Sequence, residues 1–191
     1  MSLELILSVA IGLALAAACG LRVFAPIFLL GLAAHFGRLH LASGFAWAGT
    51  TPALVALGTA TVVEIVAYYV PWLDHALDVI SAPAALMAGA VATVAVLGDL
   101  PPWLRWTTGI IAGSGLAGFT KGAAALLRVK SSAATGGLGN PVVATGESAG
   151  AVGISLLALV VPLLALLLVI GLVIVVFRVA HRVAFGGRPA A

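Results

Sequence analysis

The first apolar run of the chain contains an arginine, and this charge constrains the fold more than any other feature. Residues 3–36 would form one long membrane segment if Gly20, Arg22 and Pro26 did not interrupt them. A positive charge at bilayer depth costs from about 2.5 to more than ~10 kcal/mol, so Arg22 must face protein or water. Glycine lets a backbone bend and proline removes a hydrogen-bond donor, so we predict a helix break between Gly20 and Pro26.

Composition sets the class of protein around this break. Of the 191 residues, 63% are apolar and 8% are charged, whereas about 25% of the residues of a soluble domain are charged. Each helical span needs roughly 20 residues to cross a bilayer core about 30 Å thick. We therefore expect one transmembrane domain over residues 1–191, surrounded by the lipid bilayer and without a separate soluble domain.

The expected fold is an all-α integral membrane protein with four or five transmembrane helices plus one broken or re-entrant segment. The apolar runs lie at residues 3–19, 21–36, 52–70, 79–98, 107–127 and 152–177. Residues 21–36 amount to about 24 Å of helix, which is short for a crossing. This segment is either a tilted span or a half-helix that enters and returns, which is tolerated only inside protein or beside a cavity.

The connections carry the polar and aromatic residues. Residues 35–51 mix basic and aromatic side chains, which suits the headgroup region. Residues 128–141 have the glycine and polar content of a loop. Basic residues follow the last apolar run at Arg178, Arg182 and Arg188. They favour a cytoplasmic C-terminus, and we expect a multi-pass membrane protein.

A fainter copy of the first motif appears ninety-five positions later and is followed by Lys121. The copies share an alanine, a glycine, a leucine and a phenylalanine in register: Ala17, Gly20, Leu21 and Phe24 against Ala112, Gly115, Leu116 and Phe119. They indicate a degenerate internal repeat with a second broken segment, inverted only if an odd number of crossings separates the copies. Small residues on one face let membrane helices pack closely, which keeps a homo-oligomer open.

Four ionisable residues lie at membrane depth: Arg22, Glu64, Lys121 and Glu147. The economical arrangement pairs Arg22 with Glu64 and Lys121 with Glu147, because a buried charge is tolerated mainly when it is paired. Such pairs can simply lock helices together. Alternatively, they line a polar path near the midplane, in which Arg22 or Lys121 attracts an anionic group and Glu64 carries a proton. Asn140, in the polar stretch before Glu147, is counted with this path.

Other classes of function are disfavoured. The histidines lie in connections or the C-terminal tail without a nucleophile and base pair, so we expect no enzyme. The acidic turn with Asp74, His75 and Asp78 lacks further ligands, and no other motif implies a metal or a cofactor. The single Cys19 excludes an internal disulfide. The nine basic residues gather at the connections and the C-terminal end, which indicates membrane orientation and not nucleic-acid binding.

Several short motifs occur together along the chain: Gly20-Leu-Arg22-Val-Phe-Ala-Pro26, Glu64 with Pro71 and Asp74, Gly98-Asp99-Leu100, Thr120-Lys121, and Gly139-Asn140-Pro141 with Glu147. In this order they resemble a bacterial family of small multi-pass membrane proteins classed as a domain of unknown function. The resemblance implies a membrane location and no established activity. It also implies an aspartate after Glu147, where this chain has Ser148, so a role that needs two adjacent acids is not expected.

These features predict a small transporter or channel-like permease for a small anionic or amphipathic solute. The residues assigned to the solute or ion path are Arg22, Glu64, Lys121, Glu147 and Asn140. The alternative is a membrane scaffold or assembly partner whose intramembrane ion pairs are structural. Composition and motifs do not identify the solute.

Overall fold

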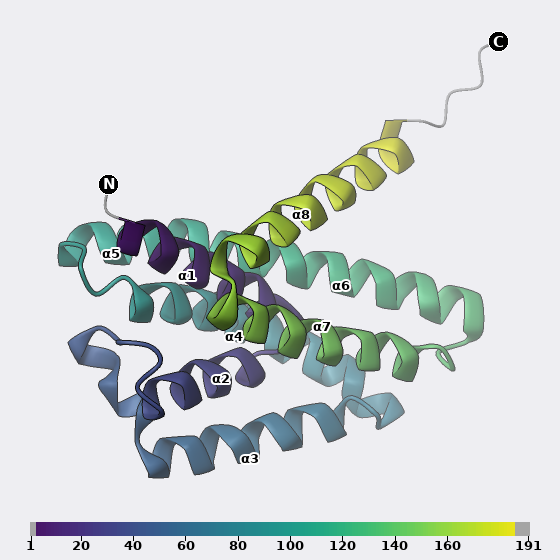
Figure 1. The fold of residues 1–191 in the computed structure, drawn as a ribbon. Helices are drawn as coiled ribbons and strands as arrows, with labels where there is room; N and C mark the ends of the chain where they lie inside the picture. Colours follow the sequence, from purple (N-terminus) through teal and green to yellow (C-terminus); the bar gives the residue numbers. More distant parts are fainter. Residues whose placement is uncertain (1–2, 186–191) are drawn as a thin grey trace.

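Every element of the computed structural model, which describes residues 3–185, is helical (Figure 1). The elements are α1 (Leu3–Leu21), α2 (Phe24–His35), the 3-10 helix η1 (Ser43–Gly49), α3 (Thr51–Ala67), α4 (Pro71–Val96), α5 (Pro102–Thr108), the π-helical turn η2 (Gly109–Gly113), α6 (Ser114–Thr135), α7 (Asn140–Val160) and α8 (Pro162–Phe185). Four segments of the described chain are long and apolar enough to cross a membrane, and a fifth is obtained if η1 and α3, bent by 68°, count as one span. The all-α membrane fold is confirmed.

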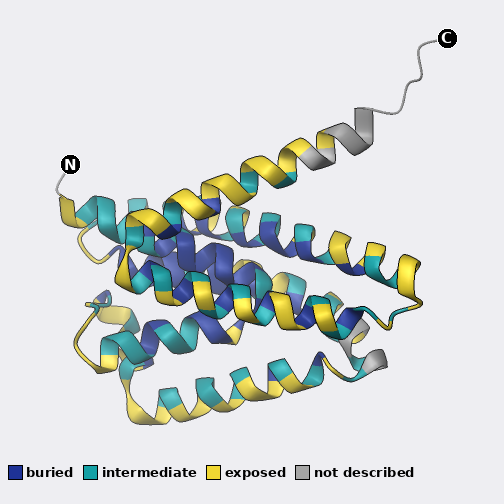
Figure 2. Cartoon of the chain, turned by 45° about the vertical axis from the view of Figure 1, so that its right-hand side comes forward, coloured by how far each residue is buried: buried dark blue, intermediate teal, exposed yellow. Residues whose placement is uncertain are grey.

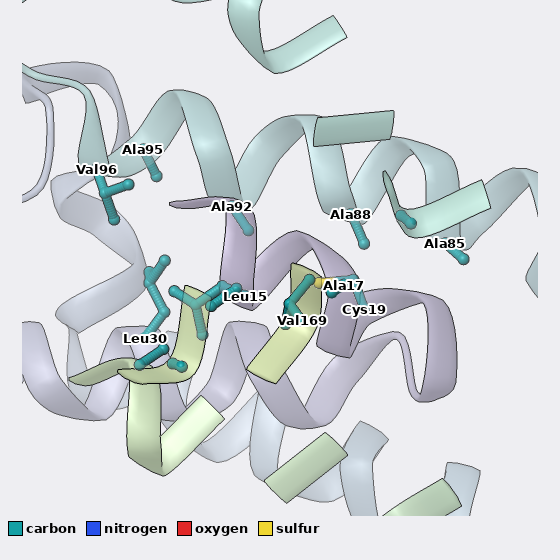
Figure 3. Packing of buried hydrophobic residues seen from close by; sticks show 14 of the residues in the cluster. Leu15, Ala17, Cys19, Leu30, Ala85, Ala88, Ala92, Ala95, Val96 and Val169 are labelled. Atoms are coloured by element: carbon teal, nitrogen blue, oxygen red, sulfur yellow. The ribbon is translucent and has the colours of Figure 1, made fainter. Parts of the chain in front are cut away.

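Helix α1 lies at the centre of the bundle and packs on α4, α6, α7 and α8. Its second half is completely enclosed, and Figure 2 shows the buried residues concentrated on the helices around it. Leu15, Ala17 and Cys19 of α1 meet a row of alanines on α4 and Val169 of α8 (Figure 3). Because most of these side chains are small, the helices approach closely, which is how membrane helices gain packing energy without a strong hydrophobic effect.

The predicted break lies between Leu21, the last residue of α1, and Phe24, the first residue of α2. Pro26 accounts for its position, because a proline has no N–H for the carbonyl of Arg22 four residues earlier and its ring would clash with it. Gly20 has a different role from the one expected. It lies inside α1, where a Cβ would overlap the side chain of Thr120 and the carbonyl of Ala117 on α6. Gly20 therefore permits a close helix contact and does not bend the chain.

After the break, α2 runs back towards the start of α1. Residues 38–43, which follow α2, line one cavity with Glu4, Leu7 and Ser8 at the beginning of α1. The N–H of Ala42 also donates to the carbonyl of Ala95 near the end of α4, at 2.8 Å. Helices α1 and α2 thus form a hairpin, and α2, with 12 residues, is a shorter apolar helix than the four candidate spans.

Two expected boundaries differ from the structure. The loop predicted at 128–141 is helical at both ends, and the turn is confined to residues 136–139, where Gly136 and Gly137 have φ of 62° and 92°. Only glycine adopts such angles freely, so the turn is short. The run at 152–177 is not one helix, because α7 ends at Val160 and Pro162 starts α8 in a new direction (Figure 1). The apolar pattern did not indicate this break, because the residues on both sides of it are uniformly hydrophobic.

The second copy of the small-residue motif is not broken. It lies in the continuous helical run from Pro102 to Thr135, which contains only the π-helical turn η2. Gly12 and Gly113 both lie against Thr93, and Gly20 lies against Thr120, so α1 and α6 run in the same direction. The two copies are therefore parallel, and the expectation of a second broken segment is wrong.

The contact between Gly20 and α6 leads to a first prediction. Gly20→Ala places a Cβ against the Thr120 side chain and the Ala117 carbonyl, and overpacking of this kind costs about 1–3 kcal/mol. Gly153→Ala on α7 is the matched control, because nothing lies within 4 Å of its added Cβ. We expect a lower melting temperature in detergent for Gly20→Ala and an unchanged or higher one for Gly153→Ala. Equal melting temperatures would contradict the close α1–α6 contact.

Candidate functional site

A buried set of ionisable side chains joins the helix ends on the side of the α1–α2 break. We call it the ion network, and its members are Arg22, Tyr68, Asp78, Lys121, Arg128 and Glu147. They come from the break itself, the turn after α3, and helices α4, α6 and α7. Five of the six residues are buried, and the Asp78 side chain is 25% exposed. The network therefore reaches the surface at Asp78.

The hydrogen bonds of the Arg22 side chain go to α7 and to the carbonyl of Leu21, the last residue of α1. Its Nη1 lies 2.8 Å from Glu147 Oε2, its Nη2 donates to the carbonyl of Ala144 at 2.9 Å, and its Nε donates to Ser148 Oγ at 3.0 Å. Nη1 also donates to the carbonyl of Leu21 at 3.2 Å. The guanidinium is thus satisfied in a place where its residue is only 1% exposed. Ser148, the departure from the family pattern, supplies a neutral acceptor.

Glu147 also binds Arg128, which the sequence prediction missed. Arg128 Nε donates to Glu147 Oε1 at 2.9 Å, and Arg128 Nη2 pairs with Oε2, so one carboxylate serves two guanidinium groups. Arg128 was assigned to a loop because the polar residues after it are typical of one. The available signal was its spacing, since Lys121 and Arg128 are seven residues apart and lie on one face of a continued helix.

Lys121 and Arg128 share a second carboxylate on α4. Lys121 Nζ lies 3.0 Å from Asp78 Oδ1, and Arg128 Nη1 lies 3.6 Å from Asp78 Oδ2. Arg128 Nη1 is buried and has no hydrogen-bond partner. The predicted pair of Lys121 with Glu147 is therefore wrong. Asp78 had been assigned to a surface turn with Asp74 and His75, whose side chains lie outside the described part of the structure.

The ring of Tyr68 lies among the three cations. Its centroid is 4.0 Å from Arg22 Cζ, 4.3 Å from Arg128 Cζ and 5.7 Å from Lys121 Nζ. The negative face of an aromatic ring attracts cations, most strongly when water is excluded. The Tyr68 hydroxyl also lies 3.0 Å from Ser81 Oγ and accepts from Lys121 Nζ at 3.4 Å. Tyr68 therefore stabilises positive charge without adding an anion.

Glu64 binds the backbone of the break and not the Arg22 side chain with which it was predicted to pair. Its Oε1 accepts the N–H of Val23 at 2.8 Å, and its Oε2 accepts the N–H of Phe24 at 3.0 Å. The first N–H groups of a helix have no partner within it, and the helix dipole favours a negative charge there. Glu64 therefore caps α2 from the neighbouring helix α3, and its two oxygens are occupied by these backbone N–H groups instead of by Arg22.

Asn140 lies at the start of α7 and exchanges hydrogen bonds with Ser132 of α6, at 3.1 and 3.2 Å. It fastens the short turn between these helices. Glu147 follows it by seven residues, or about 10 Å along the helix. Asp78 is equally far from the start of α4, and Arg128 from the end of α6. The network therefore forms a layer about 10 Å from these three helix ends.

A cavity of about 260 Å³ adjoins the network between α2, α3 and α4. Apolar atoms face it, and Glu64, Tyr68 and Ser81 belong to its wall. A second cavity of about 670 Å³ lies at the opposite end of the bundle, beside Glu4 and Arg105. Of these two cavities, the first shares Tyr68 with the ion network.

The comparisons with known proteins identify a family and no closer relative. Neither a curated protein nor a solved structure matches this chain. One family model matches residues 9–182, a range that contains the whole ion network and both sides of the α1–α2 break. The resemblance noted in the sequence is confirmed, and the helix lengths and hydropathy are those of a protein with several membrane spans. The chain belongs to the family described as Domain of unknown function (DUF4126), and it is a multi-span helical membrane protein.

Proposed function

We propose that this protein is a small permease that binds and carries a small anionic or amphipathic solute. The observation that supports it is the charge of the ion network, in which three cations, Arg22, Lys121 and Arg128, meet two carboxylates, Asp78 and Glu147. Among the described side chains these contacts join one more cation than carboxylates, and the buried Glu64 lies beside them on the N–H groups of Val23 and Phe24. Buried cations are stabilised by an anion, and the position of Asp78, at the surface of the network, is where an anion from outside can bind them.

The members of the network divide into a fixed and an exchangeable part. Arg22 and Glu147 are buried and hold α1 to α7, so we assign them the fixed part. Lys121 and the unsatisfied Nη1 of Arg128 face Asp78, whose side chain is a quarter exposed. In this proposal an incoming anion takes the place of Asp78 beside Lys121 and Arg128. Asp78 then turns towards solvent, where its charge is well tolerated.

Glu64 receives a role different from that of a proton carrier. Both of its oxygens accept backbone N–H groups of the break. We assign it the task of keeping the α1–α2 hairpin in place beneath the anion site. A carboxylate in this position also screens the positive end of α2, so the solute is directed to the side chains of the network.

The second candidate function is a membrane scaffold with a purely structural network. The contacts of Arg22 favour it, because this side chain donates to Glu147, Ser148 and two carbonyls and is almost fully enclosed. Both candidate functions include a location in a bacterial inner membrane with a cytoplasmic C-terminus. It depends on the basic residues near the C-terminal end, of which Arg188 lies outside the described residues.

Anion flux in proteoliposomes tests the permease. With chloride, acetate and decanoate as probes and an imposed potential, we expect flux of at least one anion through the unaltered protein. Lys121→Gln should reduce it at least tenfold because it removes the cation beside Asp78. Lys130→Gln, an exposed lysine on the same helix, is the matched control and should leave flux unchanged. An absence of flux from correctly inserted protein would favour the scaffold.

The carboxylate that serves two guanidinium groups generates a stability prediction. Glu147→Gln leaves Arg22 and Arg128 without their shared anion, and breaking a buried pair in this way costs about 3–5 kcal/mol. Asp99→Asn, at an exposed acid in a turn, should change stability by less than about 0.5 kcal/mol. We would compare the two variants by unfolding in detergent micelles. Similar unfolding curves would contradict this prediction, because they would mean that the contacts of Glu147 contribute little to the stability of the folded protein.

A further inference from the structure

The cavity beside the ion network opens towards lipid. Helix α3 packs mainly on α2 and only lightly on α4, and it lies at the edge of the bundle (Figure 1). Val63 of α3 and Ile80 of α4 line the cavity and are 60% and 66% exposed. Since both residues are apolar and belong to membrane-embedded helices, the opening between α3 and α4 suits a hydrocarbon chain entering from the bilayer.

The inner wall of this cavity is also a wall of the ion network. Leu77, Ser81 and Ala84 lie on one face of α4 and line the cavity, and Asp78 directly follows Leu77. Tyr68 lines the cavity as well, and its hydroxyl lies within 3.4 Å of both Ser81 Oγ and Lys121 Nζ. A molecule with its tail in the cavity therefore places its head next to Asp78 and Lys121.

The chemistry of that head follows from the group that Lys121 and Arg128 bind in the structure. It is the carboxylate of Asp78, with one oxygen 3.0 Å from Lys121 Nζ and the other 3.6 Å from Arg128 Nη1. A carboxylate of a ligand can make the same two contacts. A monocarboxylate that takes the place of Asp78 leaves the charge of the network unchanged, whereas a neutral head would remove one negative charge from it and a dianion would add one.

We propose that the solute of this site is an amphipathic monocarboxylate taken from the bilayer. Its apolar tail occupies the cavity between α2, α3 and α4, and its carboxylate replaces Asp78 between Lys121 and Arg128. The inference rests on the proposed permease function and specifies the substrate class of the same site. Tyr68 is the positioning residue, because its hydroxyl holds Ser81 at the cavity side and Lys121 at the network side.

Binding is tested on the full chain in nanodiscs of zwitterionic lipid, with decanoate as the probe and the melting temperature as the readout. A ligand that binds only the folded state raises this temperature as its concentration passes the dissociation constant. We expect decanoate to stabilise the protein, and acetate and decyltrimethylammonium at equal concentration not to do so. These two probes lack the tail and the negative charge respectively.

Two variants test the two parts of the site separately, one the cavity for the tail and the other the cation that binds the head. Ala60→Phe fills the cavity, whereas Ala56→Phe places the same ring one turn earlier on α3, at an exposed position that does not line it. Lys121→Gln removes the head contact, with Lys130→Gln as its control. We expect Ala60→Phe and Lys121→Gln each to raise the decanoate concentration for half-maximal stabilisation at least tenfold. Ala60→Phe leaves every ion pair intact, so it remains informative if Lys121→Gln folds poorly.

The outcomes separate this inference from the permease itself. Decanoate binding that is lost in both variants supports the inference, even if the liposomes show no flux and the permease fails. Equal responses of Ala60→Phe and Ala56→Phe would overturn it. It is also overturned if acetate stabilises the protein as well as decanoate does. In that case, flux of acetate in the liposome experiment would still support a permease for small hydrophilic anions.

Discussion

The buried pairing of Arg22 with Glu147 is the interaction on which the arrangement of the helices depends. A guanidinium at the end of α1 cannot be left in lipid, so α7 must present an acceptor at the same depth. Glu147 is this acceptor. It also binds Arg128, which places this part of α6 in the same layer. One carboxylate thereby sets the relative heights of three helices. The small residues of α1 then allow these helices to pack closely around it.

The break between α1 and α2 leaves backbone N–H groups and the Arg22 side chain in need of partners, and a different carboxylate binds each of them. Breaking the helix at Arg22 frees the N–H groups of Val23 and Phe24 and exposes the arginine side chain. Glu64 accepts the N–H groups, and Glu147 accepts the side chain. This division allows α2 to return along α1, because the backbone polar groups at a break within a membrane must be satisfied inside the protein. Among the described side chains, it also leaves Lys121 with one carboxylate, Asp78, at the surface of the network.

The position of the network relates fold to function. It lies about 10 Å from one end of the bundle, next to a cavity that opens between α3 and α4. Next to the network, the second half of α1 is enclosed by the alanines of α4 and by Val169 of α8 (Figure 3). In the permease that we propose, a solute reaches the network from the side of this cavity, and passage to the other side requires the helices to move. Helix α3 is the least tightly held part of the wall, since it packs chiefly on α2.

The sequence by itself determined the membrane class, the helical fold and the place of the break. Hydropathy and the Pro26 ring act locally, over one helix turn or one span, so they can be read along the chain. It did not determine the partners of the charges, because Arg22 and Glu147 are 125 positions apart. The contacts of Glu64 and of Arg128 were not predicted for the same reason. Which carboxylate meets which cation depends on which helix ends reach the same depth, and only the tertiary structure decided that.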